Sequence, residues 1–296
     1  MKKLLSTILT LTLIATSATA FSSCGGCEHI DADGDGKCDR CSDTAFNSGR
    51  IKDLSGLSLE LNADGKSYTV VGIGSCTQRD IQIGYHDGLP ITAIRDGAFK
   101  NCDSLTSVTL GDSVRSIGAS AFYGCTGLTS VTLGEGISDI EPSAFYGCYK
   151  LVEVINKSQL DITAGSAGYG DVALYAKEVH SEKSRIVRLN GYLFYTHNEV
   201  NYLLGYVGND TDLTLPESYN GEGFEIYRYA FKNCDSLTSV TLGNNVTKIG
   251  SWAFAYCGLS SIDFDGTQDE WAAIPKGSSW DYGNGSYTIS YNYTEE

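Results

Sequence analysis

Two pairs of cysteines near the start of the chain have the spacing of a zinc site. They are Cys24-x-x-Cys27 and Cys38-x-x-Cys41, and His29 lies between the pairs. Four soft donors in two tight pairs suit the tetrahedral coordination of zinc. If Cys24 carries a lipid and cannot bind the metal, His29 can be the fourth ligand. The predicted zinc ligands are then Cys27, His29, Cys38 and Cys41.

The same segment also has the residue pattern of a calcium loop. Carboxylates at alternate positions bring hard oxygen ligands around one ion, and Gly36 permits the sharp turn. The acidic residues of this calcium prediction are Asp31, Asp33, Asp35 and Asp39. The pattern departs from an EF-hand at its twelfth position, which is Ser42 instead of Glu. The stretch resembles the Asp-rich calcium-binding repeats of thrombospondin type, whose cysteines form disulfides. Zinc, calcium and a disulfide-linked or disordered acidic spacer therefore remain three alternatives.

The sequence contains none of the common catalytic patterns. The four histidines are His29, His86, His180 and His197, and none belongs to a His-Glu-x-x-His motif. The chain has no Gly-x-Ser-x-Gly elbow and no phosphate-binding Gly-Lys-Ser/Thr loop. We therefore predict no catalytic residues and no required cofactor, apart from a structural zinc or calcium ion near the N-terminus.

The N-terminus has the features of an export signal. A basic Met1-Lys2-Lys3 precedes an apolar stretch over residues 4–14, and Ala18-Thr19-Ala20 has the form of a cleavage site. The next four residues, Phe21-Ser22-Ser23-Cys24, look like a bacterial lipobox, although leucine is commoner than phenylalanine at its first position. We predict either lipidation of Cys24 or simple cleavage after Ala20. The protein is then lipid-anchored at the cell surface or secreted.

The net charge limits the partners. Lys and Arg total 21 and Asp and Glu total 36, which gives −15. Nucleic acid and anionic lipid both require a basic surface. We expect no nucleic-acid partner, and contact with a membrane only through the lipid anchor.

A repeat of 23 residues organises the rest of the chain. Ala98-Phe99 is followed by Cys102, Leu105, Val108 and Leu110, and the same residue types recur 23 positions later from Ala121-Phe122. A fixed period of this length is typical of a solenoid, whose turns stack to bury their apolar faces. The Leu-x-x-Val-x-Leu part predicts a short strand with alternate residues inward. We call one turn of this coil a rung, and expect stacked rungs about 5 Å apart.

These positions carry a family resemblance. The stretch from Ile117-Gly118 through Ala121-Phe122 and Gly124-Cys125 to Leu133-Gly134 resembles the leucine-rich repeat of BspA-like bacterial surface proteins. The resemblance implies an exported, non-enzymatic solenoid, and some members of the family are adhesins for host proteins. We predict a β-rich leucine-rich-repeat solenoid with short helical or irregular returns.

The repeats are interrupted once and flanked by other segments. The spacing between Ile81-Gln82-Ile83 and Phe99 is wider than the spacing between a strand and the next Phe inside a run. The same wide spacing recurs between Leu213-Thr214-Leu215 and Phe231. We therefore expect residues 57–83 and 192–215 to form one starting module that is used twice. A short helix is expected over residues 171–179. The predicted segments are a signal peptide (1–23), a Cys/Asp-rich segment (24–50), a hairpin cap with a widened rung (51–90), a first repeat run (91–155), an insertion with a hairpin (156–212), a second run (213–264) and a C-terminal cap (265–296).

Two surface features predict binding, while the cysteines of the repeat predict only packing. The cysteine column is expected to hold buried free thiols. Hydroxyl side chains are expected to face outward from the strands, and tyrosines to lie near the Phe position of each rung. The candidate binding residues are Thr106, Thr109, Thr129, Thr132, Thr238, Thr241, Tyr123, Tyr146 and Tyr149. We therefore predict an exported surface protein that binds a protein or glycan at the bacterial or host surface. The alternatives are a structural spacer without a specific ligand and a glycan-binding module.

Overall fold

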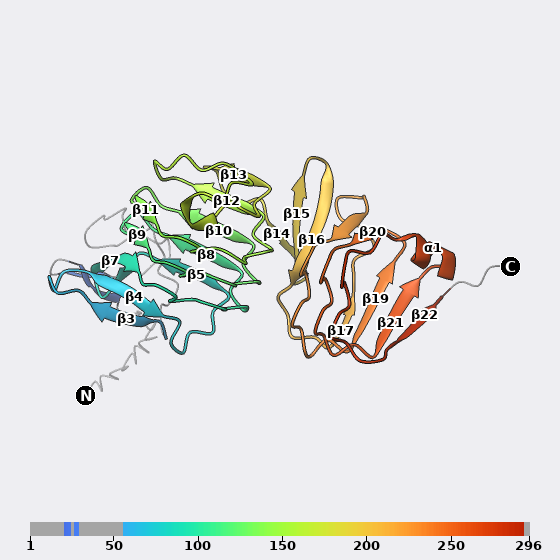
Figure 1. Ribbon diagram of the computed structural model, residues 1–296. Coiled ribbons are helices and arrows are strands. Elements are labelled where there is room, and N and C mark those ends of the chain that lie inside the picture. The colour runs from blue at the N-terminus through green and yellow to red at the C-terminus, as the bar shows by residue number, and fades with distance from the viewer. Residues whose placement is uncertain (1–20, 25–26, 30–55, 293–296) are drawn as a thin grey trace, which may run out of the picture. The chain divides into compact units, whose positions relative to one another are not determined.

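The computed structural model describes residues 21–24, 27–29 and 56–292. Near the N-terminus, β1 (Phe21–Cys24) and β2 (Cys27–His29) pair antiparallel. Residues 56–292 form a coil of mostly parallel strands, which confirms the predicted solenoid (Figure 1). Among the described residues, no helix has the length and apolar character needed to cross a membrane.

In the first run, each rung contributes one strand to each of two sheets. The Leu-x-x-Val-x-Leu strands make one sheet, in the order β13 (Glu178–His180), β12 (Glu153–Asn156), β10 (Ser130–Leu133), β8 (Ser107–Leu110) and β5 (Asp80–Ile83). The other sheet has the order β11 (Asp139–Ile140), β9 (Ser116–Ile117), β7 (Leu89–Ile94), β4 (Tyr68–Gly72) and β3 (Ser58–Leu61), and β6 (Tyr85–His86) also pairs with β7.

The second run repeats this arrangement. Its Leu-x-x-Val-x-Leu sheet has the order β17 (Asp212–Thr214), β19 (Ser239–Gly243), β21 (Ser261–Asp265) and β22 (Thr288–Tyr291). Its other sheet has the order β14 (Val187–Leu189), β15 (Tyr192–His197), β16 (Val200–Tyr206), β18 (Phe224–Ile226) and β20 (Val246–Ile249). Helix α1 (Gln268–Ala273) follows β21 and begins with a capping box between Thr267 and Glu270, which satisfies its first free backbone N–H groups.

The core of each run is a stack of identical side chains. The rings of Phe99, Phe122 and Phe145 stack with centroids 4.9 Å apart, and Phe231 and Phe254 do the same in the second run. This spacing matches the distance between neighbouring strands, as the period predicts. All five rings are buried. The stack therefore follows directly from the repeat.

The cysteine column is part of this core. Cys125, Cys148 and Cys257 are buried, as expected, and each thiol donates a hydrogen bond to the Phe carbonyl of the preceding rung at 3.0–3.2 Å. Cys102 and Cys234 are only half-buried. These two belong to the first complete rung of each run, where no earlier Phe carbonyl is available.

Both runs begin with the same module. In each, an antiparallel hairpin (β3–β4 or β15–β16) places its second strand parallel to the next rung, so that Val70 pairs with Ile94 and Leu203 with Ile226. Each hairpin also has a bulge at the same place, where the register shifts beside Gly72 and beside Gly205. The expected reuse of one module is thus seen in the strand pairing and in the bulge.

The segment between the runs contains one more turn of the coil besides the hairpin. Strand β13 pairs in parallel with β12, with Glu178 opposite Glu153. The helix expected over residues 171–179 was a wrong prediction: the structure has only the 3₁₀ turn η2 (Tyr169–Asp171) before β13. Backbone hydrogen bonds to β12 of the preceding rung hold this segment as a strand, although it lacks the Ala-Phe motif.

The second hairpin is buried on both faces. Phe194 and Leu203 belong to the core of the second run, while their neighbours on the opposite face belong to a separate cluster. The buried members of that cluster are Val152, Leu193, Tyr195, Tyr202, Leu204 and Tyr227. Because both faces are buried, each strand of the hairpin contains a run of consecutive apolar and aromatic residues and does not alternate. This cluster joins the end of the first run to the start of the second.

Candidate functional site

In-register pairing arranges the outward side chains of the first run in columns. One column across β5, β8, β10, β12 and β13 consists of Asp80, Ser107, Ser130, Glu153 and Glu178. The next column consists of Gln82, Thr109, Thr132, Ile155 and His180. Acidic groups therefore lie at both ends of a row of serines. We call this surface the first-run face.

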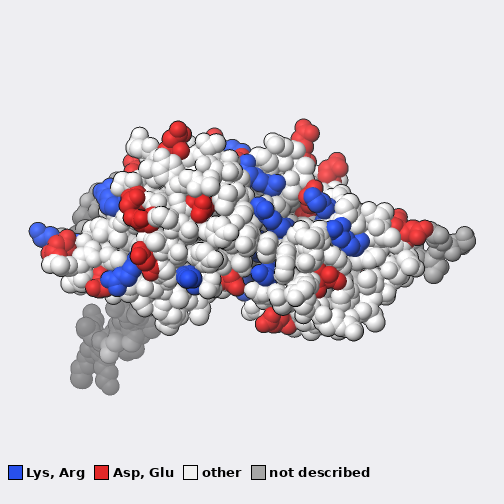
Figure 2. Space-filling model, viewed as in Figure 1, with Lys and Arg blue, Asp and Glu red and all other residues white. Residues whose placement is uncertain are grey.

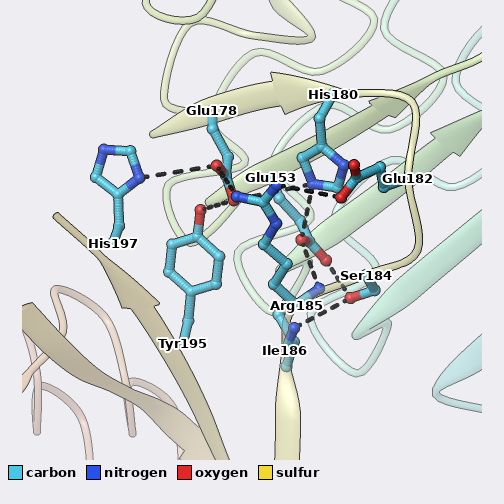
Figure 3. A network of polar contacts seen from close by, with 9 residues as sticks. All are labelled: Glu153, Glu178, His180, Glu182, Ser184, Arg185, Ile186, Tyr195 and His197. Carbon is cyan, nitrogen blue, oxygen red and sulfur yellow. Dashed lines mark hydrogen bonds and ion pairs between the residues drawn. The ribbon is translucent and has the colours of Figure 1, made fainter. Parts of the chain in front are cut away.

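A buried carboxylate lies at one end of the first-run face (Figure 3). Glu153 is fully buried, and its oxygens accept hydrogen bonds from the Ser184 hydroxyl and from the Arg185 backbone N–H, the latter at 3.0 Å. The Nε2 atom of His180 lies 3.4 Å from the same carboxylate. A buried carboxylate needs such partners because burial without them is costly. Glu153 thereby fixes the chain at residues 184–185.

Glu178, on the neighbouring strand, gathers a second set of partners (Figure 3). The Arg185 guanidinium donates to it at 2.8 Å and the Tyr195 hydroxyl at 2.6 Å, while His197 Nδ1 lies 3.9 Å away. Burial and the hydrogen bond to Glu178 raise the pKa of Tyr195. The network thus joins β13 to both β15 and the chain preceding β14.

The same cluster has donor types that suit a metal ion. One ligand atom each from Glu153, Glu178 and His180 lies within 4.8 Å of the others. However, the Arg185 guanidinium already neutralises Glu178, and a divalent cation there would face that positive charge. The geometry favours an anchoring network over a metal centre.

Residues 184–189, which we call the cover segment, extend from this network across the first-run face. At the far end of that face, Arg188 forms an ion pair with Asp80 at 3.1 Å. The face and the cover segment together enclose a shallow pocket lined by Asp80, Thr106, Ser107, Thr109, Thr129, Ser130, Thr132, Ile155, Ser184, Ile186, Arg188 and Leu193. Lys and Arg side chains gather over β14 and β15 on the side drawn in Figure 2. A segment of this chain thus occupies the hydroxyl ladder of the first run.

This occupancy corrects part of the predicted binding surface. Thr106 and Thr129 are buried, with hydroxyls that bond back to the carbonyls of Arg79 and Thr106. Both residues line the pocket, but their hydroxyl protons are used in these bonds to the backbone. Thr109 and Thr132 are half-buried in the pocket. In the second run, Thr238 is exposed and Thr241 is half-buried.

The first carboxylate of each run lies in the same hydroxyl environment. Asp80 accepts hydrogen bonds from Ser107 at 2.7 Å and Thr106 at 3.1 Å. Asp212 accepts them from Ser239 at 2.5 Å and Thr238 at 3.2 Å. Burial raises the pKa of Asp80, but the hydrogen bonds and Arg188 outweigh it, so that the pKa is lowered. The bonds from Ser239, Thr211 and Thr238 lower the pKa of Asp212.

The predicted tyrosines belong to a larger group of aromatic residues around the Phe position of each rung. We call this group the aromatic belt: Tyr123, Tyr146, Tyr149, Tyr175, Tyr229, Trp252, Tyr256 and Tyr282. Tyr123 stacks on Tyr146 with centroids 5.7 Å apart. Tyr149 instead stacks on Tyr229 of the second run at 4.6 Å and 12°. The belt therefore includes residues from both runs.

Cations accompany the rings. Lys100 lies 5.1 Å from the centroid of Tyr123, and Lys232 lies 5.1 Å from that of Tyr229 and 5.6 Å from that of Trp252. Burial and the neighbouring Tyr149 and Tyr146 raise the pKa of Tyr175 to about 12. The belt thus contains cation–π contacts, although the protein as a whole is acidic.

Two columns of the belt region have a left-handed backbone. Two positions before the Phe, every rung has a positive φ, and the residues are Gly97, Ser120, Ser143, Tyr229 and Trp252. Two positions after the Phe, the residues with positive φ are Asn101, Gly124, Gly147, Asn233 and Tyr256. Glycine and asparagine tolerate this conformation, and bulky aromatic side chains rarely adopt it. Tyr229, Trp252 and Tyr256 are therefore unusual residue types for positions with a positive φ.

Sequence reasoning missed the acidic network and the belt residues of the second run. One usable signal was the phase of Glu153, which stands 23 residues after Ser130. Another was the shared motif of Asp80-Ile-x-Ile and Asp212-Leu-x-Leu. The side chains of the predicted metal and lipid residues, from Cys24 to Cys41, lie outside the residues that the structure describes.

The fold and its faces define a leucine-rich-repeat solenoid. The family model for the BspA type leucine rich repeat region matches residues 90–199 and 206–274 in six copies, and the chain belongs to this family. A comparison with curated proteins found no match.

Similar solved structures include a leucine rich repeat protein of T. pallidum, with 21% identity, coverage of 79% of this chain and 83% of that chain, and a TM-score of 0.32. A leucine rich cell surface protein of Faecalibacterium prausnitzii has 17% identity, coverage of 81% and 94%, and a TM-score of 0.27. The pneumococcal vaccine antigen PcpA has 14% identity, coverage of 77% and 72%, and a TM-score of 0.25.

Proposed function

We propose that this chain is an exported protein of the bacterial cell surface that binds macromolecules, in adhesion or another surface interaction, and performs no catalysis. Its family supports this, since the BspA-like resemblance implies exported, non-enzymatic solenoids. The N-terminal sequence supports it as well, because residues 1–23 have the pattern of a signal peptide and Cys24 has that of a lipidation site.

The observation that carries the proposal is that three residues of the aromatic belt, Tyr229, Trp252 and Tyr256, lie on a left-handed backbone. Folding does not require aromatic residues there, because neighbouring rungs use Gly, Ser or Asn at the same positions. A bulky side chain in this conformation costs roughly 1–2 kcal/mol per residue. Contacts of the rings with one another offset this cost, at about 0.5–1.5 kcal/mol per pair. A surface that keeps large rings without a gain in stability supports a role in contact with a partner, for which tyrosine and tryptophan are favoured residues.

A double variant tests this role. Trp252→Ser and Tyr256→Asn introduce the residue types that other rungs have at these positions. We expect the full chain to lose at least about tenfold in binding to its surface target, while its free energy of unfolding changes by less than about 1 kcal/mol, because relief of strain offsets lost stacking. The assay measures binding to immobilised host matrix proteins and to cell-wall glycans.

Tyr169→Ser is the matched control. Tyr169 is also an exposed aromatic residue with a positive φ, of 48°, but it makes none of the ring contacts of the belt. We expect this variant to bind as the wild type does. Equal binding by the double variant and the wild type would contradict the proposed role of the belt. A wild-type protein that binds neither class of target would favour the structural spacer.

A second candidate is glycan binding, which the exposed end of the belt favours. Tyr256 is 44% and Tyr282 54% exposed, and the Lys232 ammonium lies beside the neighbouring rings. The apolar C–H face of a sugar ring packs on such aromatic faces, and a lysine can contact its hydroxyl or carboxylate groups. Binding confined to the glycan arm of the same assay would identify this class.

We further propose that the segment over residues 24–41 holds a structural zinc or calcium ion. The chemistry of its donors supports both ions, through Cys27, His29, Cys38 and Cys41 or through the four aspartates. The intact mass of the mature protein, together with its metal content before and after dialysis against a chelator, tests lipid, disulfides and ion together. A mature protein that carries no lipid, contains no metal and has two disulfides would contradict both the anchor and the ion.

A further inference from the structure

The two runs offer an internal comparison between an occupied and an open sheet face. Asp80 and Asp212 are the first outward residues of their runs, and each accepts hydrogen bonds from a Thr and a Ser of the next strand. In each case the Thr hydroxyl also donates a hydrogen bond to the backbone carbonyl of the residue before the aspartate, which is Arg79 or Thr211. The same module therefore builds the same oriented carboxylate twice.

The two carboxylates differ in their ionic partner. Asp80 binds Arg188 of the cover segment at 3.1 Å. Within residues 56–292, no Lys, Arg or His forms an ion pair with Asp212, which is exposed. The cover segment thus shows that the carboxylate of Asp80 pairs with an arginine. In the second run the equivalent carboxylate of Asp212 is exposed to solvent.

The rest of the second-run face is polar and acidic. We define this face as the outward side chains of β17, β19, β21 and β22, and its members are Asp212, Thr214, Ser239, Thr241, Ser261, Asp263, Thr288 and Ser290. No basic residue belongs to it. Asp263 lies on the second strand from Asp212 and two residues further along the strand direction, a separation of about 12 Å at the spacings of a β-sheet. Two residues three positions apart in an extended chain are separated by about 10 Å, and the length of an arginine or lysine side chain covers the difference.

We propose that the second-run face binds an extended, arginine-containing segment of a partner protein. One arginine pairs with Asp212, as Arg188 pairs with Asp80, and a second basic residue three positions away reaches Asp263. Charge complementarity supports this occupant, since the face carries two carboxylates and the cover segment that occupies the first-run face is basic at Arg185 and Arg188. The inference rests on the proposed function, because it names a class of partner for a protein that binds macromolecules.

A peptide with the sequence of residues 183–190, Lys-Ser-Arg-Ile-Val-Arg-Leu-Asn, is a suitable probe because this sequence already binds such a face within the chain. Fluorescence anisotropy of the labelled peptide is measured against the full chain at low ionic strength. We expect saturable binding that weakens with salt. We expect Asp212→Asn to weaken it at least about tenfold, because a paired charge is removed. A peptide with both arginines replaced by glutamine is expected not to bind.

Asp139→Asn is the matched control for charge, because Asp139 is an exposed aspartate of the first run that lies on the other sheet. We expect this variant to bind the peptide as the wild type does. Thermal unfolding of the Asp212 variant checks that it is folded. Undetectable peptide binding to the wild type at millimolar concentration, or equal binding to folded Asp212→Asn, would overturn the inference.

The belt variant with Trp252→Ser and Tyr256→Asn separates this inference from the proposed function. It is expected to keep full peptide binding, since neither residue belongs to the second-run face. If the peptide fails while macromolecules still bind through the belt, the inference fails and the proposed function stands.

Discussion

Lys150 lies buried between the two runs, where its charge is unfavourable. Its Nζ donates a hydrogen bond to the Ala230 carbonyl at 3.2 Å, and the side chain has almost no contact with solvent. Burial lowers the pKa of Lys150 from 10.5 to about 8. This group should therefore add its own pH-dependent contribution to stability, and we predict that Lys150→Met removes that contribution.

The sign follows from proton binding. Because the pKa of Lys150 is lower in the folded state, the unfolded state binds more protons between about pH 8 and 10.5. The contribution of Lys150 to the free energy of unfolding therefore rises with pH in this window, and its destabilising effect is fully present below the window. A difference of about 2.5 pKa units corresponds to about 3 kcal/mol in total, of which about 2 kcal/mol is regained between pH 8 and pH 10.

Urea unfolding followed by circular dichroism at pH 8, 9 and 10 measures this effect. We expect the stability of the wild type relative to Lys150→Met to rise by about 2 kcal/mol over this range. Lys157→Met is the control, because Lys157 is exposed, and it should follow the wild type. Cysteines with a raised pKa, such as Cys102 at about 11, act in the opposite direction across this window, and tyrosines such as Tyr192 at about 12 do so near and above pH 10. Both effects are equal in all three proteins, so the comparison between variants isolates Lys150. A Lys150→Met variant with the wild-type slope would refute the reasoning.

Three further predictions concern the rungs and the cover segment. Phe122→Ala removes the middle ring of the stack and should lower the free energy of unfolding by about 3–5 kcal/mol, measured by urea unfolding; a loss below about 1 kcal/mol would contradict the tight packing of the stack. Gly127→Ala places a methyl group 2.0 Å from a backbone oxygen of the preceding rung, so we expect a loss of at least about 1–3 kcal/mol in the same assay, and an unchanged midpoint would argue against this close approach. Asp80→Asn removes the ion pair with Arg188, which is partly exposed and worth up to about 1 kcal/mol, so amide hydrogen exchange over residues 184–189 should accelerate by up to about fivefold, with no change expected at β19.

The repeat was predictable because each of its features recurs at a fixed period. The Phe stack, the inward residues of the strands and the buried thiols of Cys125, Cys148 and Cys257 all follow from the 23-residue spacing. The rung that ends at β13 was not predicted, because the spacing from Glu153 to Glu178 is 25 residues and no Ala-Phe pair marks it. Backbone hydrogen bonds to β12 do not depend on side-chain type, so the coil continues where the sequence motif stops.

The candidate site was predicted only in part, for a similar reason. The sequence places hydroxyl residues on the outer side of each strand, and it places tyrosines near the Phe position. It does not show that residues 184–189 line the same pocket as Thr106 and Thr129, because that arrangement brings together segments with no shared pattern. It also does not show that Trp252 and Tyr256 lie at left-handed positions, since φ is set by the stacking of each rung on the next.

The sequence by itself therefore determined the class of fold, the period and the composition of the core. These depend on local pattern, and a regular coil translates pattern into position along one direction. Only the tertiary structure decided which sheet face is covered and which is open. That outcome depends on the buried pairing of Glu153 and Glu178 with residues 184–185 and on the ion pair of Arg188 with Asp80, 108 positions earlier. Such contacts arise from the folding of the chain back onto its own rungs, which no periodic pattern encodes.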